Sequence, residues 1–166
     1  MSVDIRITLA TEDDLPLIIS FIEALAEYEK LRDECIATEE RLRATLFTDQ
    51  PAAEVLIAWL DDKPAGFALF FHTYSTFLAQ RGVFLEDLFV SPEARGAGVG
   101  RALLAALARI AVDRECGRME WSVLDWNELA IGFYRRLDAR SMDEWTAFRL
   151  TGEPLRSLAN ESIPID

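Results

Sequence analysis

The segment from Arg95 to Arg101, with the sequence RGAGVGR, constrains the fold most. It places three of the protein's eight glycines between a predicted strand and a predicted helix. Glycine lets the backbone approach a ligand closely and adopt conformations that other residues avoid. The helix that follows presents unpaired N–H groups and the positive end of its dipole. Together these features indicate a cradle for a diphosphate, to which Arg95 and Arg101 can add charge-assisted hydrogen bonds.

Three kinds of phosphate loop compete for this segment. A Walker loop needs a lysine and then a hydroxyl residue after its last glycine, and neither follows Gly100. A dinucleotide loop has the spacing G-x-G-x-x-G and opens a repeated β-α-β unit, whereas the spacing here is G-x-G-x-G after a hairpin. The third kind has the pattern R-x-x-G-x-G, which Arg95, Gly98 and Gly100 fulfil. A tight strand-to-helix connection without a ligand remains an alternative.

Hydrophobic periodicity predicts the element order β-α-α-β-β-β-α-β-α-β. We expect strands at 4–9, 54–60, 66–71, 82–90, 119–124 and 145–150. We expect helices from a cap at Thr11 to about 28–31, from Thr38 over Leu46, from the glycine loop to no later than Gly117, and over 127–136. This order predicts one α/β or α+β domain over residues 1–166, with helices packed on a mixed sheet.

Composition excludes several classes of function. The net charge of −12, from 29 acidic and 17 basic residues, argues against nucleic acid and anionic membrane surfaces as partners. It leaves open both the steering of cationic ligands and a role in solubility alone. Cys35 and Cys116 lie far apart, and the chain starts without a signal-like segment, so we expect a cytoplasmic protein with reduced thiols and no metal site. The single histidine, His72, lies in an apolar run and is expected to be a partly buried strand residue.

These motifs resemble those of the GNAT superfamily of N-acetyltransferases, and within it the diamine (spermidine/spermine) N-acetyltransferases. The R-x-x-G-x-G pattern is similar to the GNAT signature that binds the pyrophosphate of coenzyme A. The likeness runs over nearly the whole chain. It also includes Ile5-Arg6, the sequence LAEYE at 25–29, LEDLFV at 85–90, Trp126-Asn127-Glu128 and Phe133-Tyr134.

The resemblance implies a GNAT fold, with a mixed, mostly antiparallel central sheet flanked by helices on both faces. It implies direct transfer of an acetyl group from acetyl-CoA, without a metal, to the primary amine of a small cation such as a diamine or polyamine. Tyr134 would be the general acid, and Glu86 the base or the ammonium anchor. The coenzyme would contact Leu88, Phe89 and Val90 with its pantetheine arm, Arg95, Gly96, Ala97, Gly98, Val99, Gly100 and Arg101 with its diphosphate, and Asn127 and Ala130 with the remainder. The amine would meet Tyr28, Glu29, Glu86, Asp87, Glu120, Trp121 and Ser122.

The adjacent acids Glu86 and Asp87 suit this chemistry. A primary amine has a pKa near ~10.4 and arrives protonated, so a site must attract a cation and then remove a proton. Burial in an apolar strand would raise the pKa of at least one acid. Since successive strand residues point to opposite faces, we expect one acid to face the amine and the other to serve the structure. A bulge near Phe89 would expose N–H donors for the thioester carbonyl. The alternative is a solvated strand edge for both acids, and ordinary helix packing for Tyr134.

One position departs from the family pattern. The resemblance implies a glycine shortly after the tyrosine helix, where this chain has Asp138. Aspartate tolerates the left-handed conformation better than most residues, so we expect the turn to survive. The chain is also shorter than the family pattern around Asp143-Glu144, which leaves the amine open. Another GNAT acceptor (an amino acid, an antibiotic amine or a protein N-terminus) and a non-catalytic acyl-CoA-binding module are the competing readings. A homodimer is expected because GNATs often pair.

Overall fold

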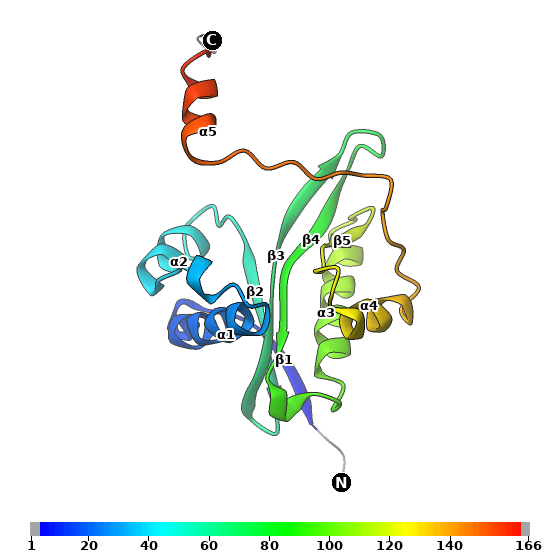
Figure 1. Ribbon diagram of the computed structural model, residues 1–166. Helices are drawn as coiled ribbons and strands as arrows, with labels where there is room; N and C mark the ends of the chain where they lie inside the picture. Colours follow the sequence, from blue (N-terminus) through cyan, green and yellow to red (C-terminus); the bar gives the residue numbers. More distant parts are fainter. Residues whose placement is uncertain (1–3, 164–166) are drawn as a thin grey trace. The chain divides into compact units, whose positions relative to one another are not determined.

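The computed structural model describes residues 4–163, which form two compact units, one ending at Leu124 and one beginning at Asp125. The first unit contains a five-stranded sheet in the order β1-β2-β3-β4-β5 (Figure 1). The strands are β1 (Ile5–Leu9), β2 (Glu54–Leu60), β3 (Lys63–Ser75), β4 (Gln80–Val90) and β5 (Met119–Trp121). Neighbours are antiparallel except β5, which runs parallel to β4. The predicted mixed, mostly antiparallel sheet is confirmed.

Helices cover both faces of this sheet (Figure 1). On one face lie α1 (Leu15–Tyr28) and α2 (Glu39–Leu46), and on the other lies α3 (Val99–Asp113). Short 3-10 turns occur at Glu12–Asp14 (η1), Arg32–Glu34 (η2) and Pro92–Ala94 (η3). The core between α1, α2 and the sheet consists of Ile18, Phe21, Leu25, Leu46, Val55, Ile57, Phe67 and Phe89. On the other face, α3 buries Val99, Leu103, Leu104, Leu107 and Ala111, so apolar side chains cover both faces of the central strands.

Local sequence signals set where the helices begin. The backbone N–H of Thr11 donates to the carboxylate of Asp14 at 2.8 Å, and the Thr11 hydroxyl lies 3.2 Å from the same oxygen. This reciprocal cap precedes η1, and α1 follows directly. The hydroxyl of Thr38 accepts from the N–H of Arg41 at 3.2 Å and caps α2. The predicted cap at Thr11 lies at a helix start, and α2 begins after Thr38 as predicted.

The second unit contains α4 (Glu128–Arg135) and α5 (Gly152–Ala159). The helix predicted over 127–136 is confirmed, and Asp138 adopts φ +61°, the left-handed conformation expected of it. The strand predicted at 145–150 is wrong, because this segment forms no strand in the described structure. The helix α5 was not predicted. An alternating pattern yields a strand only where a neighbouring edge completes its hydrogen bonds, and the pattern itself does not supply that edge.

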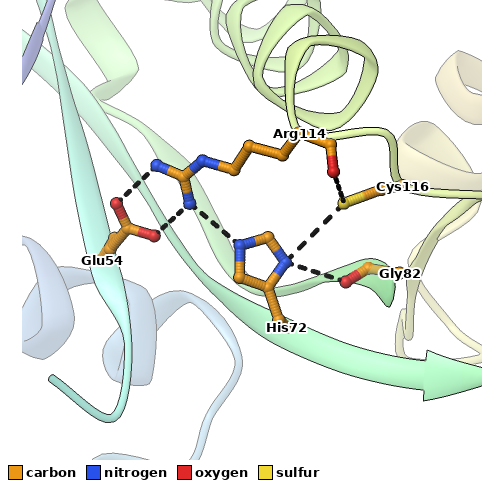
Figure 2. Close-up of polar contacts among 5 residues, drawn as sticks. All are labelled: Glu54, His72, Gly82, Arg114 and Cys116. Atoms are coloured by element: carbon orange, nitrogen blue, oxygen red, sulfur yellow. Dashed lines mark hydrogen bonds and ion pairs between the residues drawn. The ribbon is translucent and has the colours of Figure 1, made fainter. Parts of the chain in front are cut away.

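A polar cluster ties the C-terminal end of α3 to the sheet (Figure 2). The guanidinium of Arg114, which follows α3, forms a bidentate ion pair with Glu54 at the start of β2, one contact being 2.8 Å. It also contacts Nε2 of His72 at 2.9 Å and lies 5.9 Å from the ring centre of Phe70. The Arg114 hydrogen bond is the main cause that lowers the pKa of Glu54. The cluster thus fixes the end of α3 that lies opposite the glycine loop.

The contacts of His72 select one tautomer of its ring. A guanidinium only donates, so Nε2 of His72 accepts from Arg114. The carbonyl of Gly82 only accepts, and it lies 3.1 Å from Nδ1, which therefore carries the proton. The thiol of Cys116 lies 3.8 Å from the same nitrogen. His72 is half-buried in β3, as the sequence predicted, and it acts as a structural link between α3 and the sheet.

We predict that Arg114→Lys lowers the free energy of unfolding by about 1 kcal/mol, because an ammonium cannot form the two-pronged contact with Glu54. The matched control is Arg109→Lys, whose pair with Asp113 is exposed and is worth a few tenths of a kcal/mol. Urea unfolding at pH 7 measures both. The lowered pKa of Glu54 means that the pair stabilises above the unfolded pKa and loses its effect as Glu54 is protonated. The loss should therefore shrink as the pH falls below the ordinary glutamate pKa of 4.5 and through the lowered pKa of Glu54. Equal losses for the two variants at pH 7 would contradict this role of Arg114.

Candidate active site

An irregularity in the β3–β4 ladder shapes the site. Leu69 pairs with Asp87, but the next residue of β3, Phe70, pairs with Leu85. Glu86 is therefore an extra residue in β4, opposite no residue of β3. The bulge predicted near Phe89 lies instead at Glu86, because Phe89 pairs regularly with Phe67 in the core.

The extra residue changes which side chains share a face. Asp87 pairs with Leu69, and Phe84 pairs with Phe71, so both lie on the face covered by α1 and α2. Without the insertion, an odd separation of three residues would place them on opposite faces. Glu86 is exposed at the bulge, whereas Asp87 is half-buried. The two predicted acids therefore differ in environment, as expected, and it is Asp87 that the register turns toward α1.

The pairing of β4 with β5 ends at the same place. The ladder runs from Val83–Met119 to Leu85–Trp121. Beyond it, the part of β4 from Glu86 to Val90 has a strand partner on only one edge among the residues that the structure describes. The predicted pantetheine contacts Leu88, Phe89 and Val90 all lie in this stretch. Every second residue of this stretch directs its backbone N–H and C=O away from β3, and these groups lie at the edge open to an extended ligand.

The glycine loop has the conformation that a diphosphate cradle needs. Gly96 and Gly98 adopt φ +81° and +93°, a region that residues with a side chain avoid. A Cβ at Gly96 would meet nothing within 4 Å, so the loop faces open space there. Gly98 is the N-cap of α3, no side chain caps this helix, and its first turn has no acidic residue. The N–H groups and the positive dipole end of α3 are therefore free for an anion.

The side chains around the glycine loop differ in their contacts and exposure. The guanidinium of Arg95 lies 4.9 Å from the ring centre of Tyr28, and its Nε donates to the carbonyl of Val90 at 3.2 Å. Arg95 thus contacts a predicted amine-site residue rather than extending freely to a phosphate. Arg101 is exposed in the first turn of α3. Val99 is buried against the sheet, so only its backbone can contact a ligand; Ala97 and Gly100 are half-buried beside it.

Three carboxylates gather between α1 and the bulge. Glu29 follows the last residue of α1, Tyr28, and its burial raises its pKa. Burial raises the pKa of Asp87 to about 6, with smaller contributions from the charges of Glu86 and Glu29. Such a cluster attracts a cation and contains a carboxyl that ionises near neutrality.

The predicted residues after this cluster are only partly brought together. In β5, Glu120 pairs in register with Phe84 and so shares the face of Asp87, and it forms an ion pair with Arg118 at 2.9 Å. Trp121 pairs with Leu85 and lies on the α3 face. Ser122 is exposed just beyond the strand. Of these three, the register favours Glu120 as a companion of Asp87.

The remaining predicted residues belong to the second unit. The side-chain oxygen of Asn127 accepts from the N–H of Ala130 at 3.2 Å and caps α4. Tyr134 lies in α4, with its ring centre 5.5 Å from that of Phe133. Asn127 therefore has a structural task that the sequence did not indicate. The bulge at Glu86 was also missed, since its position depends on pairing with a strand that lies apart in the chain.

Known proteins are similar to this chain in sequence and in fold. The profile of the acetyltransferase (GNAT) family matches residues 22–139. The chain belongs to this family. A thialysine N-epsilon-acetyltransferase of Sus scrofa is 38% identical over 163 residues, which cover 92% of this chain and 95% of the relative. A spermidine/spermine N(1)-acetyltransferase-like protein of Homo sapiens is 32% identical over 94% of this chain and 24% of its own length. The solved structure of an integron cassette protein from V. cholerae has a TM-score of 0.79 and 30% identity, over 97% of this chain and 99% of its own.

The resemblance stated from the sequence is thus confirmed, and so is its fold. The GNAT family uses acetyl-CoA, and the residues of this acetyltransferase fit a coenzyme diphosphate: two glycines with positive φ lead into a helix N-terminus without acids. Backbone N–H groups between Gly96 and Arg101 would hold the diphosphate, and the open stretch of β4 would hold the pantetheine arm. The coenzyme supplies the thioester, and the protein supplies position and proton transfer.

We predict that Asp87→Asn stabilises this acetyltransferase at high pH. Because the folded-state pKa of Asp87 is about 6 against an ordinary 3.8, ionisation destabilises the fold increasingly as the pH rises from about 4 to above 6. The amide removes this penalty, so its gain in unfolding free energy should be larger at pH 8 than at pH 4.5, by on the order of 1–2 kcal/mol. Urea titrations at the two pH values measure it.

The matched control for this measurement is Asp62→Asn. Asp62 lies at the β2–β3 turn with its side chain 93% exposed. Its substitution should change stability by a few tenths of a kcal/mol, alike at both pH values. A gain from Asp87→Asn that does not depend on pH would contradict the raised pKa.

Proposed function

We propose that the protein transfers the acetyl group of acetyl-CoA to a primary amine at one end of a small substrate that carries more than one charge. The observation that carries this proposal is a carboxylate group at the bulge: Asp87 lies on the α1 side of β4, and the charges of Glu86 and Glu29 act on it. The glycine loop and helix α3 serve the coenzyme, and the carboxylates serve the ammonium. The two halves of the site are joined by β4 itself.

Two substrate classes compete within this proposal. A diamine or polyamine suits the carboxylates, since each of its charges is positive. An amino acid with a side-chain amine, such as the thialysine in the name of the pig relative, also needs a partner for its own carboxylate. Arg95 supplies a guanidinium over the ring of Tyr28, and it bonds the carbonyl of Val90 through Nε and not through its terminal nitrogens. We therefore place the dibasic amino acid beside the diamine as a second candidate.

The experiment mixes the protein with acetyl-CoA and single amines and follows the release of free thiol. The panel contains a diamine, a polyamine, thialysine, ornithine, an aminoglycoside and a peptide with a free N-terminus. We expect fast release with a diamine, polyamine or dibasic amino acid, and slow release with the other two acceptors. Release with the aminoglycoside or the peptide alone would overturn the substrate class. Coenzyme binding with no release on any amine would reduce the protein to an acyl-CoA-binding module.

Tyr134 is proposed as the general acid that returns a proton to the sulfur of coenzyme A. We predict that Tyr134→Phe lowers the turnover number by roughly 100-fold, the usual scale of general acid catalysis, with coenzyme affinity within about twofold. Steady-state kinetics and calorimetric titration with coenzyme A measure the two quantities. Tyr74→Phe removes the same hydroxyl from an exposed strand position and should leave turnover unchanged. Normal turnover in Tyr134→Phe would remove this residue from the mechanism.

We also propose a cytoplasmic homodimer. No helix within residues 4–163 is long and apolar enough to cross a membrane. Cys35 and Cys116 are both free thiols, which suits a reducing compartment. The dimer is proposed from the family, because GNATs often pair. Light scattering on the purified protein tests the dimer.

A further inference from the structure

We propose that Asp87, and not its neighbour Glu86, accepts the proton that the ammonium substrate must lose before it attacks. This assignment rests on the proposed function and names the proton acceptor within it. The resemblance of the sequence to its family favours Glu86 for this role. The pairing of the strands points to the next residue instead.

The pairing of β3 with β4 places Asp87 and Glu86 in different environments. Asp87 lies opposite Leu69, whose side chain packs against the core beneath α1 and α2. Glu86 is the unpaired residue of the bulge and is exposed to solvent. A carboxylate in water has its ordinary affinity for a proton, whereas one held against an apolar layer binds a proton more tightly. The bulge therefore separates two adjacent acids into a solvated one and one held against the core.

The surroundings of Asp87 make its carboxylate a stronger base. The charged groups that act on its carboxyl are Glu86 on its own strand and Glu29, which follows the last residue of α1. Burial acts most strongly on its carboxyl, and the charges of Glu86 and Glu29 act in the same direction, which places its pKa at about 6. An acceptor of this pKa is ionised at neutral pH and is a stronger base than an ordinary aspartate. Glu29 and Glu86 remain to hold the positive charge of the substrate.

The proton and electron balance is simple. The ammonium gives one proton to a carboxylate oxygen of Asp87 and becomes a neutral amine. The amine lone pair then forms the C–N bond to the thioester carbonyl carbon, and the C–S bond breaks. The second proton lost by the nitrogen ends on the sulfur, giving the amide and free coenzyme A. Asp87 releases its proton to solvent and returns to the carboxylate, so no other reactant is needed.

The test measures the pH dependence of kcat and kcat/KM between about pH 5 and 9, by thiol release, with the amine that the wild type uses best. For the wild type we expect kcat/KM to fall below about pH 6, because protonated Asp87 cannot accept a proton. Asp87→Asn should lose this acid limb and lower kcat by roughly 100-fold. Asp87→Glu, which keeps a carboxyl at the same strand position, should restore part of kcat. Asp62→Asn on the exposed β2–β3 turn is the control and should follow the wild-type profile.

Glu86→Gln gives the opposing signature. If Asp87 is the acceptor, this variant keeps the acid limb and moves it to lower pH, because a neighbouring negative charge that raises the pKa of Asp87 is gone. Loss of the limb in Glu86→Gln would assign the proton to Glu86. A raised KM with unchanged kcat in Asp87→Asn would make Asp87 an ammonium anchor. Either result overturns the proposal.

Two measurements separate these outcomes from other failures. Coenzyme A binding by calorimetry and a cooperative urea transition must be retained in Asp87→Asn, which is expected to be at least as stable as the wild type. Its activity loss then reflects chemistry and not unfolding. A wild type that releases no thiol with any amine overturns the proposed function together with this assignment, whereas an active wild type with the opposing signatures overturns the assignment alone.

Discussion

The ladder between β3 and β4 is the interaction on which the rest of the site depends. Ten residue pairs join the strands, and one unpaired residue, Glu86, interrupts them. The insertion has two effects at once. It turns Asp87 onto the face of α1, and it coincides with the end of the β4–β5 ladder at Leu85, so the following backbone stays open on one edge. The open backbone edge of β4 and the orientation of Asp87 thus both occur at one irregularity in the β3–β4 ladder.

The two ends of helix α3 differ in what stabilises them. At its start, glycines with positive φ and the absence of capping side chains leave the N–H groups free, which favours an anion but contributes nothing to stability by itself. At its end, Arg114 is bound to Glu54 and His72, and these contacts fix the helix against the sheet. The contacts at the C-terminal end of α3 offset the missing hydrogen bonds at its N-terminal end. A helix anchored in this way can present its dipole to a ligand without being displaced.

Features that depend on neighbouring residues could be predicted from the sequence, and features that depend on distant pairing could not. The glycine loop, the cap at Thr11, the helix start after Thr38 and the left-handed turn at Asp138 each follow from a few adjacent residues. The bulge was expected near Phe89 and lies at Glu86, because its position is decided by which residue of β3 faces which of β4. The strand predicted at 145–150 is wrong for the same reason. Periodicity shows which side chains would share a face of a strand, but it does not show whether a partner strand is present.

The raised pKa of Asp87 also bears on what the net charge of −12 means. A diffuse surplus of acids keeps a protein soluble and needs no ligand. Asp87 is different, because burial and two neighbouring negative charges raise its pKa. At neutral pH its ionisation therefore lowers the free energy of unfolding. Proteins lose stability in this way where a site requires it. A bound ammonium, placed among Glu29, Glu86 and Asp87, would relieve the repulsion, and the relief would favour cationic substrates over neutral amines of the same shape.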